Sequence, residues 1–420
     1  MLVGGTIPVA LGAVEEALGS LPGRYLGARR GHDVTYHFVV ADLGRTWEIR
    51  LREDEAWVRR GVSRTPDVAV GLDAATGLEL VLGERTGIEA FFARELSVRG
   101  NLELAIAFEG MFARPDGTPP IAALRTVGPR RRALSVLTVG HGPDVLLIHG
   151  LGSSKLSFLD TAATLGREYR VHALDLPGFG ASDKPVARYD ARCLAEAVVA
   201  FMDADGIGSA HLVGNSLGGR VALEVGLEHP ERVRSLALLC PAVAFVRRTF
   251  APLVRLSRPE LAVLPHRFHP AMVAASFRNM FGDPHALDPR LAELAVEDFQ
   301  RSYRSARARH AFMAAGRNIY LDPPFGRDGF YPRLAELVPP ALFLWGSEDR
   351  LIPAAFSGVV AEWLPAAEQV VLEGCGHVPQ IERPTQTLGL LRRHFSHADG
   401  LGAPRAAGGR FAGAERRVAA

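Results

Sequence analysis

The stretch HLVGNSLGGRVALE, residues 211–224, decides the fold class of this chain. Residues 211–214 are mostly apolar and predict a buried strand, while residues 217–228 carry apolar side chains at helical spacing. Between them lies GNSLG, residues 214–218, the one G-x-S-x-G sequence in the chain. At such a junction the serine needs a strained backbone, and the residues two before and two after it crowd each other, so both are glycine. The stretch therefore predicts a sharp strand-to-helix turn that projects the Ser216 hydroxyl above a sheet.

Strand and helix patterns alternate along residues 132–397. Such alternation indicates an α/β fold with a doubly wound, mostly parallel sheet. Functional groups gather at the carboxyl ends of such strands, so the partners of Ser216 are expected in the loops that follow them. Apolar runs predict these further strands at 144–149, 171–174, 235–240, 341–345 and 369–372, and helical spacing predicts helices at 191–205 and 384–395.

A serine hydroxyl is a weak nucleophile unless a base takes its proton. His377 closes the glycine-rich sequence GCGH, residues 374–377, after the last predicted strand. Asp349 closes WGSED, residues 345–349, after the strand before it. The order Ser, Asp, His predicts that His377 is the base and that Asp349 orients it. Glu348 is the competing acid, and we favour Asp349 because of its spacing after the strand.

The sequence HGLG, residues 149–152, ends the first strong strand and predicts a site for a developing negative charge. The backbone N–H groups of Leu151 and Leu217 are candidates for an oxyanion hole beside Ser216. A phosphate loop is excluded here, because residues 150–155 do not fit the G-x-x-x-x-G-K-[ST] spacing.

Neither a metal nor an organic cofactor is predicted. No C-x-x-C pair occurs, and no cysteine or carboxylate cluster completes a zinc site around His266 and His269.

Several motifs in one order closely resemble the α/β-hydrolase family, in its lid-bearing branch of esterases, lipases and carbon–carbon bond hydrolases. They are HGLG, LDLPGFGASDKP at 174–185, GNSLGG, and the WGSED and GCGH pair. The resemblance spans residues 132–397 and implies a serine hydrolase that forms an acyl-enzyme. Asp175 and Asp183 match family positions that shape loops, so neither is given a catalytic role. Serine at position 216 excludes the dehalogenase and epoxide hydrolase relatives, which carry aspartate there.

The sheet pattern stops between about residues 241 and 332, where helical spacing and many aromatic residues appear instead. The resemblance implies that this insertion is a helical cap over the active site. Such a cap would exclude water and line an apolar pocket, so an apolar or lipid-like ester is the expected small-molecule substrate. Most of the aromatic rings are expected to pack the cap's own core, with a few facing Ser216.

Residues 1–115 form a second, smaller unit. Alternating apolar residues at 46–51 predict a strand, and apolar spacing at 101–112 predicts a helix, which together indicate an α+β domain. PDVAV at 66–70, a GERT turn at 83–86 and LSVRGNLELAIAFEGMF at 96–112 resemble the sterol-carrier-protein lipid-binding family over about residues 20–115. The resemblance implies an apolar tunnel that holds a lipid. The alternative is that the phenylalanines of this unit fill a solid core.

The expected organisation has four parts. The N-terminal α+β domain covers residues 1–115, and a linker rich in proline, glycine and arginine covers 116–131. The hydrolase domain covers 132–397. Residues 398–420, biased to glycine, alanine and arginine, predict a disordered tail.

Composition narrows the classes of protein further. Of 420 residues 48% are hydrophobic, which excludes a disordered or collagen-like chain, and a net charge of +2 argues against nucleic-acid binding. The longest apolar run, residues 236–246, is about half the length of a membrane-spanning helix. Three scattered cysteines (Cys193, Cys240 and Cys375) and an N-terminus unlike a signal peptide predict a cytoplasmic protein.

The sequence thus predicts a cofactor-independent serine esterase. Two alternatives use the same site: a carbon–carbon bond hydrolase, for which the compact HGLGSS loop is shorter than usual, and a thioesterase or acyltransferase. From a different class comes a lipid carrier with an accessory hydrolase domain. An inactive relative of the family is a further alternative, and the presence of every expected chemical group argues against it.

Overall fold

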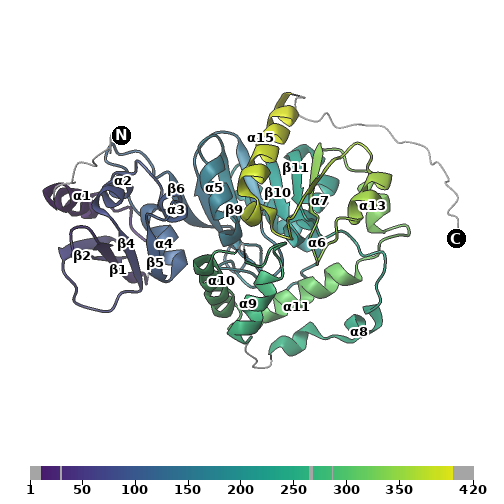
Figure 1. Cartoon of the computed structure of the whole chain (residues 1–420), viewed down its shortest axis with the longest axis horizontal. Coiled ribbons are helices and arrows are strands. Elements are labelled where there is room, and N and C mark those ends of the chain that lie inside the picture. The colour runs from purple at the N-terminus through teal and green to yellow at the C-terminus, as the bar shows by residue number, and fades with distance from the viewer. Residues whose placement is uncertain (1–10, 29–30, 264–267, 286, 401–420) are drawn as a thin grey trace.

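The structure is a computed structural model that describes residues 11–28, 31–263, 268–285 and 287–400 (Figure 1). Its strands form two sheets, one of five strands in the order β3-β2-β1-β4-β5 and one of eight in the order β13-β12-β11-β10-β8-β9-β7-β6. Figure 1 shows the smaller sheet, drawn in purple, at one end of the long axis and the larger sheet at the other. No helix among the described residues has the length and apolar character that crossing a bilayer demands.

The small sheet belongs to an α+β unit, as the sequence predicts. Strands β1 to β3 are antiparallel neighbours, β4 runs parallel to β1, and β5 is antiparallel to β4. Helices α1 to α4 help to close its core, in which Tyr36 and Phe38 of β1 pack against Phe108 of α4. The strands are β1 (Asp33–Val40), β2 (Arg45–Arg52), β3 (Glu55–Arg60), β4 (Val68–Leu72) and β5 (Ser97–Gly100). The helices are α1 (Leu11–Arg24), α2 (Ala74–Leu82), α3 (Gly87–Phe92) and α4 (Leu102–Glu109).

The large sheet confirms the predicted doubly wound α/β fold. Strands β8 to β13 are parallel, and the pair β6 and β7 continues the sheet in antiparallel pairing at the β9 side. Strands β8 to β12 are almost wholly buried because helices cover both faces, whereas the edge strand β13 is partly exposed. The eight strands of the large sheet are β6 (Ala122–Val127), β7 (Leu134–Val139), β8 (Asp144–Ile148), β9 (Arg170–Leu174), β10 (Ala210–Asn215), β11 (Val233–Leu239), β12 (Ala341–Gly346) and β13 (Glu368–Leu372).

Two hydrophobic cores lie on the two faces of the large sheet. One core packs α6 (Ala191–Ala204), α7 (Leu217–Glu228) and α13 (Phe356–Trp363) against it. The other packs α5 (Leu159–Leu165) and α15 (Pro384–Gly400) against the sheet. The short helix η1 (Lys155–Phe158) precedes α5, α14 (Pro379–Glu382) precedes α15, and η2 (Pro230–Arg232) lies between α7 and β11. The segment between β11 and β12 is helical, as expected for a cap, and Figure 1 shows it below the sheet. It contains α8 (Ala251–Leu256), η3 (Pro259–Val263), α9 (Pro270–Arg278), α10 (Pro289–Ser302), α11 (Ala306–Leu321) and α12 (Phe330–Leu334).

The sequence predicts a linker at residues 116–131, but the structure contains a strand within this segment. Residues 122–127 form strand β6, which pairs with β7 along its whole length as the edge of the large sheet. The surrounding proline, glycine and arginine residues conceal this short strand in the sequence. At the other end, helix α15 continues to Gly400, so its last turn includes residues that the sequence assigns to the tail, and residues 401–420 lie outside the described part.

A buried lysine joins the two units. Lys155 of η1 is fully buried, and its Nζ lies 2.7 Å from Asp175 Oδ2 and also pairs with Glu103 of α4 in the N-terminal unit. Burial opposes the charge on Lys155, but the two carboxylates outweigh it and raise the pKa of the ammonium. Asp175 also accepts the Lys155 backbone N–H at 2.7 Å. This network fixes η1, the loop after β9 and α4 to one another.

We predict that Lys155→Met destabilises the chain far more than Lys184→Met, although these are the two lysines of the sequence. Removing Lys155 leaves the buried Asp175 and the partly exposed Glu103 without their cation, which costs about 3–5 kcal/mol. The partly exposed Lys184 ammonium binds only the backbone carbonyls of Gly180 and Ser182, so its loss costs about 1 kcal/mol. Free energies of unfolding from urea titrations compare the two, and equal losses would contradict the prediction.

Candidate active site

Ser216 occupies the sharp turn that the sequence predicts. Strand β10 ends at Asn215, helix α7 begins at Leu217, and Ser216 has φ 52° and ψ −114°. A Cβ atom on Gly218 would lie 2.0 Å from the Ile148 carbonyl oxygen, and one on Gly214 would lie 2.3 Å from that of Gly218. Both positions therefore require glycine, as the crowding argument expects. The strained backbone is held by this close packing.

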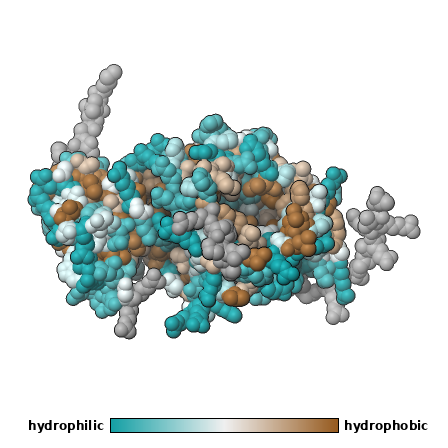
Figure 2. Space-filling view, turned by 90° about the horizontal axis from the view of Figure 1, so that it is seen from below, coloured by the Kyte–Doolittle hydropathy of each residue, from teal (hydrophilic) through white to brown (hydrophobic). Residues whose placement is uncertain are grey.

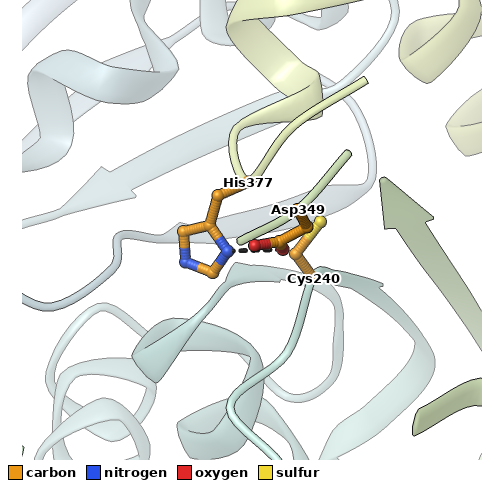
Figure 3. Close-up of side chains that lie close together, drawn as sticks. All are labelled: Cys240, Asp349 and His377. Carbon is orange, nitrogen blue, oxygen red and sulfur yellow. Dashed lines mark hydrogen bonds and ion pairs between the residues drawn. The ribbon is translucent and has the colours of Figure 1, made fainter. Parts of the chain in front are cut away.

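His377 and Asp349 meet at the carboxyl ends of their strands. His377 Nδ1 donates a hydrogen bond to Asp349 Oδ2 at 2.7 Å, and Figure 3 shows the two side chains facing each other. Asp349 Oδ1 accepts the backbone N–H groups of Leu351 at 2.8 Å and Ile352 at 2.9 Å, so the carboxylate cannot turn away. Both side chains are buried, whereas the competing acid Glu348 is exposed. This bond leaves Nε2 of His377 without a proton and available as a base.

Asn215 connects the serine turn to the histidine loop. Its Nδ2 donates to the carbonyl of His377 at 2.9 Å and to that of Leu239 at 3.0 Å. The residue directly before Ser216 is thereby bonded to the residue that carries the imidazole. Sequence reasoning missed this role, and the only signal for it was a polar side chain at the end of an apolar strand.

The HGLG loop is fixed by its own histidine. His149 Nδ1 donates to the Gly150 carbonyl at 2.8 Å, and its Nε2 accepts the Leu176 N–H at 3.0 Å. Burial lowers the pKa of His149, which keeps the ring neutral and this pattern of donor and acceptor intact. A Cβ on Gly150 would lie 3.3 Å from Ser216 Cβ, so the loop rests against the serine. Leu151 and Leu217, which follow Gly150 and Ser216 in the chain, therefore flank the serine.

Aromatic rings of the cap reach the HGLG loop. A Cβ on Gly152 would lie 3.0 Å from a ring carbon of Phe312 and 3.6 Å from one of Phe299. These two rings pack with Phe268 and Tyr303, at centroid distances between 4.3 and 6.4 Å. The cluster joins α10 and α11 and places apolar rings of the cap against the HGLG loop. The approach of cap aromatics to Ser216 itself stays a prediction.

Cys240, directly after β11, lies beside the histidine and aspartate (Figure 3). Donor atoms of Cys240, Asp349 and His377 lie within 4.8 Å of one another, the one such group found among the described residues. Burial holds the pKa of the Cys240 thiol well above its ordinary value, and the thiol donates to the Gly376 carbonyl at 3.6 Å. A cation here would need the thiolate and the imidazole nitrogen that already serves Asp349. Of the histidines considered earlier, His269 caps α9 and His266 lies outside the described residues.

The N-terminal unit contains an apolar cavity of about 60 Å³ between its sheet and its helices. Phe91 and Phe108 line this cavity, whereas Phe112 is buried in the core of the unit. One lining residue, Leu159 of α5, comes from the large unit. The carboxyl group of Glu109 also faces the cavity, and its burial raises its pKa to about 8 despite hydrogen bonds from the Gly87 N–H.

Comparison with known proteins adds to this geometry. Residues 143–384 match the family model of the alpha/beta hydrolase fold, and residues 17–113 match that of the SCP-2 sterol transfer family. A pimeloyl-[acyl-carrier protein] methyl ester esterase of Aeromonas salmonicida is 32% identical over 265 residues, which are 62% of this chain and 98% of the esterase. A 2-hydroxymuconate semialdehyde hydrolase of Pseudomonas sp. strain CF600 is 31% identical, over 62% of this chain and 89% of that enzyme.

Among solved structures, the crystal structure of a membrane phospholipase A, described as a bacterial virulence factor, aligns with a TM-score of 0.56. It is 31% identical and covers 66% of this chain and 87% of its own.

We predict that Glu109 makes stability fall as the pH rises toward 8. The pKa of this carboxyl is about 8 in the folded chain against 4.5 ordinarily, so between these values the folded state keeps a proton that the unfolded state has lost. Stability is greatest below this window and falls through it. Glu109→Gln removes this contribution to the dependence of stability on pH, whereas Glu84→Gln, at an exposed carboxyl, leaves that dependence unchanged. Urea unfolding midpoints measured across the window test this, and the same slope in both variants would refute it.

Proposed function

This chain belongs to the α/β-hydrolase family, and from this premise we propose that it is a cofactor-independent serine hydrolase that cleaves carboxylic esters of apolar or lipid-like substrates. The observation that carries the proposal is the 2.7 Å hydrogen bond between His377 Nδ1 and Asp349 Oδ2, beside the strained turn that presents Ser216. An imidazole held in this tautomer next to a serine is what activation of a hydroxyl requires.

The proposed reaction has two halves. Ser216 Oγ attacks the ester carbonyl carbon while His377 Nε2 takes its proton, and Asp349 stabilises the resulting imidazolium. The Leu151 and Leu217 N–H groups hold the negative oxygen of the tetrahedral intermediate, each contributing about 3 kcal/mol. The carbon–oxygen bond then breaks, and His377 protonates the departing alkoxide. Water, activated by the same imidazole, attacks the acyl-enzyme and releases the acid and the free serine.

Three observations support an apolar ester as the substrate. The cap places Phe299 and Phe312 against the HGLG loop, where they offer apolar contact and no charge. Two of the similar proteins are named as a methyl ester esterase and a phospholipase A. The cavity of the N-terminal unit is lined almost wholly by apolar side chains. We therefore assign lipid-like acyl groups, and we place the enzyme in the cytoplasm because its described cysteines are all free.

A carbon–carbon bond hydrolase is the second candidate, and the similarity to 2-hydroxymuconate semialdehyde hydrolase favours it. The same serine, histidine and aspartate would serve, with a carbanion leaving in place of an alkoxide. Thioesterase or acyl-transfer chemistry differs only in the leaving group or the acceptor. Parallel assays with a ring-cleavage diketone, a thioester and an oxygen ester rank these activities directly.

For the N-terminal unit we propose binding of a lipid in the cavity that Phe91, Phe108 and Leu159 line. Because Leu159 belongs to the hydrolase unit, a lipid in this cavity would touch both parts of the chain. The unit would then hold lipid close to the enzyme. A carrier whose hydrolase is only an accessory is the alternative, and it predicts lipid binding without turnover.

We predict that Ser216→Ala lowers hydrolysis of p-nitrophenyl esters by about 10⁶-fold and that Asp349→Asn lowers it by about 10⁴-fold. The first change removes the nucleophile. The second reverses the tautomer of His377, because an amide donates to Nδ1 where the carboxylate accepts. Initial rates with short and medium acyl chains measure both effects.

The neighbouring Glu348 supplies the matched control. Its carboxylate is exposed, so Glu348→Gln leaves the rate near that of the parent chain. Equal turnover by the parent and Ser216→Ala would end the proposal. A large loss in Glu348→Gln with none in Asp349→Asn would reassign the acid.

We predict that Ala105→Phe, which fills the N-terminal cavity, displaces bound lipid from the full chain. Ala105 lines the cavity, whereas Ala107 on the same helix does not, so Ala107→Phe is the matched control. Both changes are made together with Ser216→Ala, so that a bound ester survives. Native mass spectrometry with organic extraction, and titration with a fluorescent fatty acid, measure occupancy. Equal occupancy in both variants, or an empty parent chain, would leave the unit with a structural role only.

A further inference from the structure

The outer face of the cap carries a group of exposed apolar side chains. We name it the cap patch and define it by its five members, each more than half exposed. Elsewhere on the hydrolase unit, exposed large apolar residues such as Val186 and Val338 stand singly. Exposed apolar groups that lie together on a surface mark an interaction site, whereas single ones do not. The five members fall within residues 250–272, and α8 and η3, which carry four of them or lie directly beside them, both pack on α11. The members are Phe250 (64%), Leu253 (69%), Leu256 (77%), Leu261 (58%) and Met272 (69%).

Helix α8 shows that the patch is not a by-product of packing. Its inner side buries Ala251, half-buries Val254 and packs on α11. Leu253 and Leu256 are three residues apart and extend outward, where they gain nothing from folding of the chain. A short helix with apolar side chains on both its inner and outer sides is suited to a second contact outside the molecule.

The charged side chains around the cap patch are almost all positive. Residues 246–278 contain six arginines and a single acidic residue, Glu260. Among the residues that the structure describes, no acidic side chain pairs with the exposed arginines of this segment. Figure 2, which views the molecule from the side on which Figure 1 draws α8 and α9, shows apolar patches bordered by hydrophilic residues. The exposed, unpaired arginines are Arg247, Arg255, Arg258 and Arg278.

We propose that the cap patch docks the protein on a membrane surface that contains anionic lipids. The leucines and Phe250 would enter the boundary between headgroups and acyl chains, and the arginines would meet the lipid phosphates. Charge complementarity favours this partner over a second copy of the chain, since a two-fold dimer through the patch would bring its own arginines together. The inference goes beyond the proposed hydrolysis and does not depend on it.

Docking would place the cap between the membrane and the active site. The outer side of the cap carries the patch, while its inner rings Phe299 and Phe312 lie at the HGLG loop. A lipid-like substrate would therefore have its source at the face of the protein nearest to the cap. Both sides of one small insertion would serve the same class of molecule.

The experiment is vesicle co-sedimentation of the full chain carrying Ser216→Ala, which separates binding from turnover. Vesicles of phosphatidylcholine alone are compared with vesicles that also contain phosphatidylglycerol. We expect binding only to the second kind, weakened by added salt, and reduced by about tenfold or more in Leu253→Ser/Leu256→Ser and in Arg255→Glu/Arg258→Glu.

Two variants elsewhere on the surface provide matched controls. Val186→Ser changes an isolated side chain that is 90% exposed, and Arg327→Glu reverses an exposed arginine far from the patch in sequence. Both should bind as the parent does. The four surface variants are also prepared with Ser216 unchanged. Their hydrolysis of a water-soluble ester then shows that each variant is folded.

Three results would overturn the proposal. No sedimentation of the parent chain with anionic vesicles would do so, as would equal loss of binding in the patch variants and the controls. A dimer of the parent in solution that the leucine changes dissociate, without any vesicle binding, would assign the patch to a second copy. If the parent chain binds anionic vesicles but hydrolyses no ester, that result would count against the proposed function alone.

Discussion

The site depends on a steric constraint at the turn between β10 and α7. The backbone of Gly218 touches the carbonyl of Ile148, and Gly214 touches Gly218, with no room at either place for a side chain. This contact holds α7 against β8 and accompanies the positive φ of Ser216. Because β8 also carries the HGLG loop at its end, the same contact helps to set the position of that loop relative to Ser216. The strained backbone of Ser216 is therefore held in place by the close packing of the glycines on either side of it.

Sequence reasoning was most successful where chemistry imposes a local pattern. A buried parallel strand must be apolar throughout, and this pattern predicts β10. A serine turn must be flanked by glycine, and a loop that returns an imidazole must be flexible. These two requirements single out Ser216 and His377 in the sequence. Spacing after the strand favours Asp349 over Glu348 as the acid. In the structure Asp349 is buried and accepts two backbone N–H groups, while Glu348 is exposed.

What the sequence concealed are pairings between distant residues. Asn215 is hydrogen-bonded to His377, 162 positions along the chain, and Lys155 pairs with Glu103, 52 positions away. Neither separation corresponds to the repeat of a helix or a strand, so no local pattern in the sequence indicates these pairs. Strand β6 was missed for a related reason, since its pairing with β7 is all that distinguishes it from the linker composition around it. His149 was identified only as part of a motif. Its neutral ring, hydrogen-bonded through both nitrogens, fixes the shape of the HGLG loop.

The two units are joined by more than a chain connection. The Lys155 network binds α4 to the core of the hydrolase, Arg301 of the cap helix α10 reaches Asn101 at 3.0 Å, and Leu159 closes the N-terminal cavity. The cavity of the N-terminal unit thus borders α5 of the hydrolase unit directly. The interface therefore combines apolar packing, in which Ile88 and Ile106 join the hydrolase core, with an ion pair of defined geometry between Lys155 and its two carboxylates. Loss of the lysine would leave those carboxylates without their cation, which is why the ion pair ties the position of α4 to that of η1.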